Sequence, residues 1–235
     1  MSLNDPQAVR TEYATEERLA GRASVYEWAD GDDPHEILWC AVAERAPARI
    51  LEVGCGPGEL AQRLARELGA EVVAVDQSER MVELTRHRGI DVRLGDVQEL
   101  PFAADEFDCA VAAWMLYHVP DLDRGLAELA RVLRPGGRLV AVTNSRGHLR
   151  ELYDLLEVER PLLSFGAETA AEALAPHFAH VESRPALGSI LFPSRDDAQA
   201  YVDVTQILGG DGRRLPPLDG PLRVTRAPYV FVADK

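Results

Sequence analysis

The chain has 235 residues, of which 46% are hydrophobic, and a formal net charge of −14. A chain of this length can bury one sizeable core, with a small appended subdomain. The acidity argues against a nucleic-acid partner, because phosphate contacts require clustered Lys and Arg side chains. The sequence contains neither a transmembrane run nor a secretory signal, so we expect a cytoplasmic protein with no membrane partner.

The cysteines indicate a reducing compartment. Cys40, Cys55 and Cys109 are odd in number and form no Cys-x-x-Cys pair. This pattern predicts structural thiols, with neither a disulfide framework nor a zinc site. No other set of metal ligands stands out, so we expect no metal.

The first three fifths of the chain alternate between short apolar runs and amphipathic segments. Residues up to about Ala46 are predicted to be helical, and Asp33-Pro34 is a plausible helix start. The expected strands then cover residues 50–53, 71–76, 91–96, 108–114 and 138–143, and the expected helices cover residues 59–68, 78–88 and 123–133. This alternation predicts βαβ units and a doubly wound, mostly parallel sheet of the α/β class.

The pattern loosens after Thr143. The remaining expected elements are helices at 148–160, 168–178 and 196–208, strands at 180–192 and 223–235, and a surface loop at 211–221. We therefore divide the chain into an N-terminal helical cap at residues 1–48 and an α/β domain at residues 49–235. Helical insertions at about 147–166 and 194–220 are expected either to cover the substrate as a lid or to pack as ordinary helices.

A glycine-rich turn follows the first expected strand, in the stretch ILEVGCGPGEL. Gly54, Gly56 and Gly58 stand at alternate positions just before a helix. Ligands of α/β sheets lie beyond the carboxyl ends of the strands, where backbone amides and a helix N-terminus face them. The dinucleotide register is Gly-x-Gly-x-x-Gly, and here Glu59 inside the helix would repel a diphosphate. The turn therefore favours a nucleoside without phosphates over a dinucleotide, with a plain tight turn as the structural alternative.

Two acidic residues end the next two expected strands. Asp76 could accept hydrogen bonds from both hydroxyls of a ribose, and Asp96 could accept one from an adenine amino group. Each is also explained as an ordinary strand-end or turn residue. Their occurrence on successive strands after the glycine turn favours the nucleoside site.

From about Arg49 to Thr143 the chain resembles the class I S-adenosylmethionine-dependent methyltransferases, and within them a small-molecule subgroup. The resemblance lies in EVGCGPG, VVAVDQSERMVELTR, GDVQELPF and DEFDCAVAAWMLYHVPDLDRGLAELARVLRPGGRLVAV. It implies a seven-stranded Rossmann-like sheet with the last strand inserted antiparallel. It also implies S-adenosyl-L-methionine as cofactor and methyl transfer to oxygen, nitrogen or carbon of a small-molecule substrate.

The resemblance also implies the residues that hold the cofactor. The methionine moiety would lie against Glu52 and the glycine turn, the ribose at Asp76, and the adenine at Asp96. Near the N-terminus, Tyr13 and Arg22 fall where related enzymes fold a helix over the cofactor. Arg22 could pair with the methionine carboxylate or be an exposed helical arginine. The full set is Arg22, Glu52, Gly54, Cys55, Gly56, Gly58, Asp76, Gln77, Met81, Asp96, Val97, Gln98, Ala113, Trp114 and Met115.

Two histidines are candidate catalytic bases. A methyl group on a sulfonium is already activated, so an enzyme needs mainly to align the reactants and remove a proton. His118 follows the fourth expected strand, and His148 opens the first C-terminal helix. Their structural alternatives are a hydrogen bond to backbone for His118 and a helix cap or surface position for His148.

Other functions stay open at this point. The fold does not guarantee the activity, so a non-catalytic S-adenosylmethionine-binding regulatory protein is one alternative. A methyltransferase that acts on protein or nucleic acid is another. A nicotinamide-dependent oxidoreductase is disfavoured by the glycine register and by Asp96. The sequence favours no particular oligomeric state.

Overall fold

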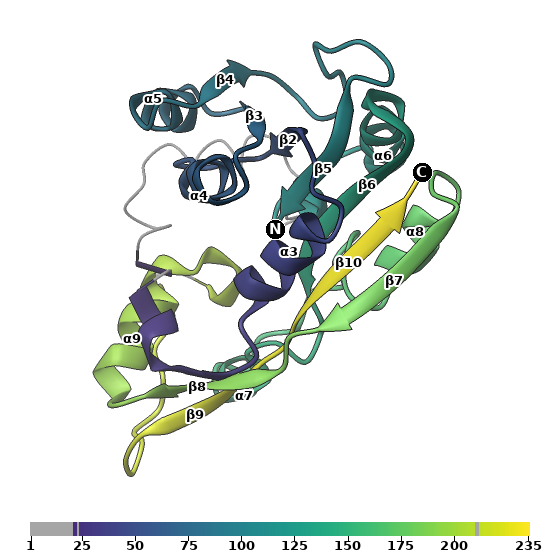
Figure 1. The fold of residues 1–235 in the computed structure, drawn as a ribbon. Coiled ribbons are helices and arrows are strands. Elements are labelled where there is room, and N and C mark those ends of the chain that lie inside the picture. Colours follow the sequence, from purple (N-terminus) through teal and green to yellow (C-terminus); the bar gives the residue numbers. More distant parts are fainter. Residues whose placement is uncertain (1–20, 23, 210–211) are drawn as a thin grey trace.

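The computed structural model describes residues 21–22, 24–209 and 212–235. Its centre is a seven-stranded sheet with the strand order β4-β3-β2-β5-β6-β10-β7 (Figure 1). β10 runs antiparallel to β6 and β7, and the other neighbouring strands run parallel. The strands are β2 (Arg49–Val53), β3 (Glu71–Asp76), β4 (Asp91–Leu94), β5 (Phe107–Ala113), β6 (Leu133–Asn144), β7 (His180–Pro185) and β10 (Pro228–Asp234). The prediction of a seven-stranded, mostly parallel sheet is confirmed.

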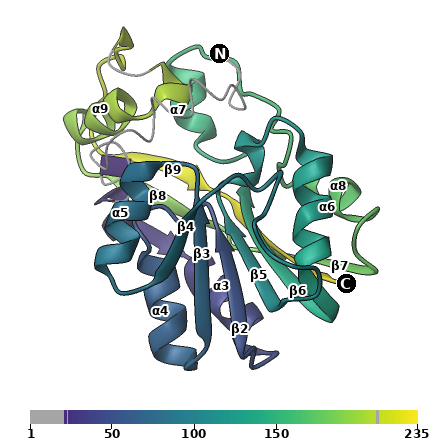
Figure 2. The same ribbon diagram turned by 90° about the horizontal axis from the view of Figure 1, so that it is seen from above.

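Helices cover both faces of this sheet (Figure 2). Ile50 of β2 packs in a cluster with side chains of α3 and α4, whereas its neighbour Leu51 packs in a cluster with α6 and α8. Successive side chains of a strand point to opposite faces, so a strand covered on both faces is almost wholly apolar. The helices are α3 (Pro34–Ala43), α4 (Glu59–Leu68), α5 (Glu79–His87), α6 (Leu122–Val132) and α8 (Ala170–Leu174).

Local signals set the limits of these helices. Gly58 precedes α4 with φ 80°, and Gly69 follows it with φ 66°, both in the left-handed region. The Ser78 hydroxyl accepts a hydrogen bond from the N–H of Met81 and so caps α5. Such caps satisfy N–H groups that have no partner within the helix. The helices expected at 59–68, 78–88 and 123–133 are confirmed to within one residue at each end.

A second sheet of three antiparallel strands has the order β1-β8-β9. Its strands are β1 (Ala29–Gly31), β8 (Gly188–Phe192) and β9 (Leu222–Arg226). Residues 186–187 join β7 to β8 and Ala227 joins β9 to β10, so one two-stranded ribbon runs through both sheets (Figure 1). Pro228 pairs with Asn144, the last residue of β6. The small sheet therefore extends beyond the carboxyl ends of the parallel strands.

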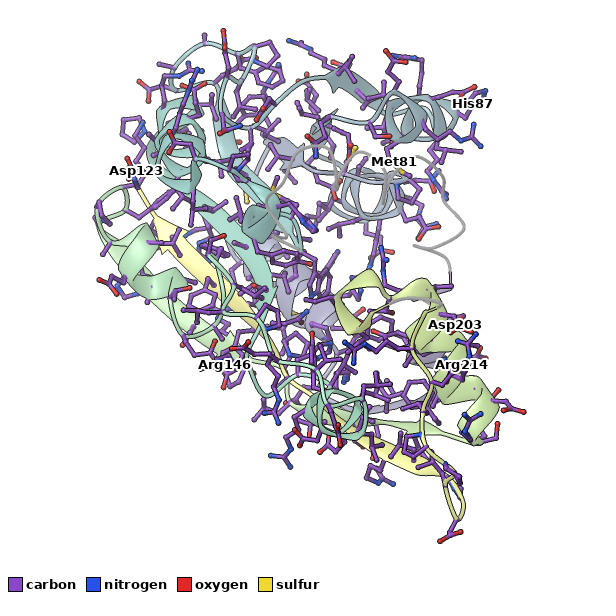
Figure 3. All side chains as sticks on the ribbon, turned by 180° about the vertical axis from the view of Figure 1, so that it is seen from behind. Met81, His87, Asp123, Arg146, Asp203 and Arg214 are labelled. Carbon is purple, nitrogen blue, oxygen red and sulfur yellow. The ribbon has the colours of Figure 1, made fainter. Side chains whose placement is uncertain are left out.

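The small sheet has its own hydrophobic core. The elements that pack on it are α7 (Arg150–Leu155), α9 (Arg195–Val204), η1 (Val25–Trp28) and η3 (Gln206–Leu208). Tyr153 and Tyr201 are buried in this core. Asp203 of α9 forms an ion pair of 3.0 Å with Arg214 of the following loop (Figure 3). The two insertions are thus parts of a small folded unit, and their action as a lid stays a prediction.

The structure corrects the sequence prediction at the N-terminal side. Residues 25–31 form η1 and β1, so the helix expected up to Ala46 is wrong there. Gly31 has φ 94° and pairs with Gly188 so closely that an added Cβ would lie 2.4 Å from the carbonyl oxygen of Leu187. A helix cannot supply this contact, and pairing with a strand far along the chain decides the local structure.

Two further differences lie in the C-terminal third. The runs expected as single strands at 180–192 and 223–235 each divide in two where the ribbon passes between sheets. The helix expected at 148–160 is reduced to α7. Residues 1–20, with Tyr13, lie outside the described residues, and the division of the chain at residue 48 stays a prediction. In the described part of the chain, no helix has the length and apolarity needed to cross a membrane.

Candidate cofactor site

The turn between β2 and α4 requires its glycines. Gly54, Gly56 and Gly58 have φ values of 65°, 54° and 80°, in the left-handed region that side chains disfavour. A Cβ on Gly54 would lie 2.7 Å from Cβ of Met115, and one on Gly58 would lie 2.6 Å from Oγ1 of Thr85. The turn is therefore a shallow stretch of bare backbone between the ends of β2 and β5.

Asp76 fastens this turn to the end of β3. The N–H of Gly56 donates to Oδ2 of Asp76 at 2.9 Å, and the N–H of Ser78 donates to Oδ1 at 2.9 Å. Burial raises the pKa of the Asp76 carboxyl, while the N–H groups of Ser78, Gly56 and Gln77 oppose that rise. A carboxylate offers roughly four acceptor positions, so one position is left for a ligand hydroxyl.

α5 holds the other side of the turn. The hydroxyl of Thr85, which is fully buried, donates to the carbonyl oxygen of Gly56 at 2.9 Å. Nε of Arg88 donates to the carbonyl oxygen of Pro57 at 2.7 Å, and Nη2 of Arg88 forms an ion pair with Glu59. The carbonyl oxygens of Gly56 and Pro57 thus have donors on α5 or at its C-terminal end. The ion pair also reduces the repulsion that we expected Glu59 to exert on a diphosphate.

Glu52 is the polar group of the site that lacks a partner. It lies on β2 with 3% of its surface exposed, and its Oε2 has no hydrogen-bond partner among the described residues. Burial, and secondly the charge of Asp76, raises the pKa of Glu52 to about 8. An uncompensated buried carboxyl costs free energy. A cationic group of a ligand within reach would favour its ionised form, which fits the amino group of a methionine moiety.

The residues expected to meet an adenine form a small network beside α6. The backbone N–H of Gln98 donates to Asp96 at 2.9 Å, and its side-chain amide contacts both oxygens of that carboxylate. The side-chain oxygen Oε1 of Gln98 accepts from the N–H of Asp121, which caps α6. Val97 is buried against Gly125 of that helix. The network holds the exposed Asp96 at the carboxyl edge of β4.

The segment after β5 lies across the glycine turn. Ala113 ends β5, and Trp114 follows it with φ 53°, a conformation rare for a large residue and frequent at functional sites. The indole N–H of Trp114 donates to Oδ1 of Asn144 at 3.2 Å, and its ring lies 4.9 Å from that of His35. Met115 packs directly against Gly54. β5 and β6 thus bring their ends together beside the turn.

Three other expected cofactor residues lie around the turn and the end of β3. Gln77 is exposed after Asp76. Met81 on α5 (Figure 3) and Cys55 in the turn are both buried, and the Cys55 sulfur lies 3.6 Å from Oγ1 of Thr85. Burial raises the pKa of the Cys55 thiol. Cys55 therefore contacts the same threonine that holds the turn, and Met81 is a buried residue of the neighbouring helix.

Arg22 and His148 lie on the side of the small sheet, and His118 follows β5 of the main sheet. Arg22 donates to the carbonyl oxygen of Val204 at 3.3 Å, at the end of α9. His118 lies in η2 (Leu116–His118), with its ring 4.5 Å from that of Tyr117. The roles predicted for Arg22 and His118 stay predictions.

His148 has a defined tautomer in this structure. The N–H of Ala227 donates to its Nδ1 at 3.2 Å, so Nε2 carries the proton in the neutral ring. Burial, and secondly the charge of Arg226, lowers the pKa of His148 to about 4. The ring is therefore neutral near pH 7 and must lose the Ala227 hydrogen bond before Nδ1 can accept another proton. The predicted catalytic role of His148 stays a prediction.

The sequence analysis missed Thr85 and Arg88. Thr85 lies one turn after Met81 and next to buried positions of α5, so a polar residue stands on the apolar face of that helix. That pattern could have indicated a buried hydrogen bond. Arg88 precedes a helix-ending glycine, and only the folded chain brings it to the turn. Among the described residues, no three His, Cys, Asp or Glu side chains gather as a metal site would require.

Comparison with known proteins gives the family of the central sheet. Residues 51–141, from β2 into β6, match the family described as a methyltransferase domain. These residues are similar to that family, and the chain as a whole has the fold of class I S-adenosylmethionine-dependent methyltransferases. The match covers the glycine turn, Asp76, Asp96 and the segment after β5.

Relatives and solved structures agree with this assignment. Methyltransferase GfsG of Streptomyces halstedii is 40% identical over 117 residues, which are 46% of this chain and 42% of that protein. A ubiquinone biosynthesis O-methyltransferase of Xanthomonas oryzae pv. oryzae is 36% identical over 138 residues, 51% of this chain and 56% of that protein. The chain thus spans about half the length of these relatives. A methyltransferase structure from Thermotoga maritima shares the fold, with TM-score 0.61, 21% identity, and coverage of 96% and 99% of the two chains.

Replacing Thr85 by Val tests whether α5 positions the glycine turn. The side chains have nearly the same shape, so the variant loses mainly the hydrogen bond to Gly56. We expect affinity for S-adenosylhomocysteine to fall about 2- to 10-fold, which corresponds to one net hydrogen bond. Isothermal titration calorimetry measures this change.

A matched control is Thr205→Val in α9's C-terminal turn. Thr205 is also buried and donates to a backbone carbonyl, that of Tyr201, at 2.7 Å. Both variants should lose similar thermal stability, but only Thr85→Val should lose affinity. Equal affinities for the two variants would remove Thr85 from the positioning of the turn.

Replacing Glu52 by Gln tests the buried carboxyl through its pH dependence. The pKa of Glu52 is raised from its ordinary 4.5 to about 8, so the folded protein binds a proton that the unfolded chain has released. Between these pH values, stability contributed by the protonated carboxyl is lost as the pH rises. In the cofactor-free protein, the free energy of unfolding should therefore fall by a few kcal/mol between about pH 5 and about pH 8, and it should fall less in Glu52→Gln. Urea unfolding over this pH range measures both. The same pH dependence of unfolding free energy in the two proteins would contradict the raised pKa.

Proposed function

We propose that the chain is a methyltransferase that transfers the methyl group of S-adenosylmethionine to a small molecule. The observation that supports this most is the glycine turn, held in left-handed conformation and fastened to Asp76 at the end of β3. In an α/β sheet this is the place where strand ends and backbone amides meet a nucleoside ligand. Oε2 of Glu52, on the strand before the turn, has no hydrogen-bond partner among the described residues and suits a cationic amino group.

Different residues of the site are proposed to bind different parts of the cofactor. The acceptor position left on Asp76 suits one ribose hydroxyl, fewer than the two expected from the sequence, and Asp96 and Val97 suit the adenine. Glu52 and the glycine turn suit the methionine moiety. S-adenosylmethionine, when bound, supplies a methyl group that its sulfonium has already activated. The chain then needs to align the acceptor with that methyl group and to exclude water, which can contribute roughly 7–11 kcal/mol.

The acceptor is proposed to bind between the main sheet and the small sheet. The small sheet lies beyond the carboxyl ends of the parallel strands, on the side of the glycine turn. The relative involved in ubiquinone biosynthesis is described as an O-methyltransferase, which supports a small-molecule acceptor and an oxygen atom as the first to test. His118, after β5, is the first candidate for a base, since Nδ1 of His148 already accepts the N–H of Ala227.

The compartment proposed for this activity is the cytoplasm. Cys40, Cys55 and Cys109 are all free thiols in the structure, as expected where the environment is reducing. The acidic charge of −14 supports a small molecule over a nucleic acid as substrate. A regulatory protein that binds S-adenosylmethionine without turnover is the alternative. Binding of the cofactor without methyl transfer to any acceptor of a broad panel would favour it.

The proposed cofactor is tested by direct binding. We expect S-adenosylmethionine and S-adenosylhomocysteine to bind, and NAD to bind far more weakly or not at all. Calorimetry on the full chain measures all three ligands. Tight binding of NAD with no heat from S-adenosylhomocysteine would contradict the proposal.

Asp76→Asn tests the ribose position. The charged acceptor becomes a neutral amide, and a hydrogen bond to a charged group is worth about 1.5–3 kcal/mol. We expect S-adenosylhomocysteine affinity to fall by at least about tenfold. Asp108→Asn is the matched control, because Asp108 also accepts two backbone N–H groups, those of Ala48 and Arg49, at the opposite edge of the sheet. A control that loses as much affinity as Asp76→Asn would indicate a general loss of fold.

A further inference from the structure

Arg226, at the end of β9, is a buried cation that forms no ion pair with any described residue. Only 3% of its surface is exposed. Nη2 donates to the backbone oxygens of Asp30 and Asp32, and Nε is buried with no acceptor among the described residues. Within the part of the chain that the structure describes, no carboxylate forms an ion pair with this guanidinium. The two carbonyls satisfy some of its N–H groups, but they leave its charge unbalanced.

Three rings from three elements lie in the field of Arg226. They are Tyr26 of η1, His35 of α3, and His148 between β6 and α7. Burial lowers the pKa of both histidines, and the charge of Arg226 lowers them further. Both rings are therefore neutral near pH 7 and cannot add to or balance that charge.

Four other charged groups act on Tyr26 and His35, namely Arg22, Asp33, Arg63 and Glu36. Arg63 and Glu36 form an ion pair with each other. Arg22 acts on Tyr26 and donates to the carbonyl of Val204. Asp33 acts on Tyr26 and His35, and its carboxylate accepts the N–H of His35 as the cap of α3. Among the described residues, each of these groups therefore has a partner other than Arg226.

A series of contacts leads from the residues after Arg226 to the cofactor site. Its neighbour Ala227 donates to His148, and the next residue, Pro228, pairs with Asn144 at the end of β6. Asn144 accepts the indole N–H of Trp114. The residue after Trp114 packs on the first glycine of the turn. Arg226 therefore lies at the carboxyl edge of the sheet, on the side where the small sheet faces the proposed acceptor.

Burying a guanidinium without an accompanying anion is unfavourable in free energy. Arginine binds carboxylates and phosphates in a bidentate geometry. We propose that Arg226 binds an anionic oxygen group, a carboxylate or a phosphate, carried by the methyl acceptor. This inference rests on the proposed function, since it makes Arg226 a specificity-determining residue of the acceptor site. A purely structural arginine, which only ties β1 to β9, is the alternative that the experiment must exclude.

The experiment uses the full chain with saturating S-adenosylhomocysteine. Benzoate, phenyl phosphate and the neutral benzamide are added at equal concentration, and thermal stability and calorimetric binding are measured. At least one of the two anions should bind and raise the melting temperature of the unmodified protein, and benzamide should not. The stronger of the two anions then identifies carboxylate or phosphate as the preferred group.

Variants separate binding from structure. Arg226→Met should weaken anion binding by at least about tenfold, which corresponds to one charge-assisted hydrogen bond. Arg226→Lys keeps the charge and should retain part of the binding even if it loses stability. Arg223→Met is the matched control on the same strand, because Arg223 is exposed and donates to Ser189. It should bind the anions as the unmodified protein does.

The outcomes that would overturn the inference are distinct from those that would overturn the proposed function. No binding of either anion, equal binding of benzamide, or equal affinities in Arg226→Met and Arg223→Met would make Arg226 a structural residue. If Arg226→Met does not fold, Arg226→Lys is compared with the neutral Arg226→Gln instead. Equal anion affinities in these two variants lead to the same conclusion. S-adenosylhomocysteine binding is measured separately, and its absence would contradict the methyltransferase assignment and leave the anion result to be judged alone.

Discussion

The hydrogen bond from the N–H of Gly56 to the carboxylate of Asp76 is the contact on which the site depends. It joins the turn after β2 to the end of β3, two strands that are neighbours in the sheet. The same carboxylate also holds the start of α5 through Ser78. α5 in turn provides Thr85, whose hydroxyl holds the carbonyl of the same glycine. Gly56 is therefore held through both its N–H and its carbonyl oxygen, which gives a ligand a rigid surface of bare backbone.

The buried polar groups near this contact differ in how many of their atoms have hydrogen-bond or ion-pair partners. Asp76 has backbone donors, whereas Glu52 lacks a partner for one oxygen and Arg226 lacks a counter-ion among the described residues. Most buried polar groups in native proteins are paired, so those that are not call for a specific explanation. Among the described residues, four side chains have such an atom, and Glu52 and Arg226 are two of them. These two lie toward the carboxyl ends of the parallel strands and have opposite charge preferences. They suit a cationic cofactor moiety on one side and an anionic acceptor on the other.

Much of the main sheet could be predicted from the sequence, because its signals are local. The glycine that ends α4 and the serine that caps α5 placed these two helices to within one residue. The apolar runs located the strands less closely, because β6 begins at Leu133, before the expected start at residue 138. The glycine turn and the acidic strand ends could likewise be found by spacing alone. The small sheet could not, since β1 forms only by pairing with β8, more than 150 residues further along the chain. Arg226 was missed for the same reason: its burial depends on β1, whose carbonyls it binds.

The ribbon shared by the two sheets has a consequence for motion. β7 continues into β8 and β9 into β10, so the small sheet cannot slide over the main sheet without breaking both ladders. The soft points are residues 186–187 and Ala227, where the ladder passes from one sheet to the other. Ala227 is also the residue whose N–H donates to the His148 ring. A rotation of the small sheet about this joint would therefore act on the hydrogen bond that the imidazole accepts.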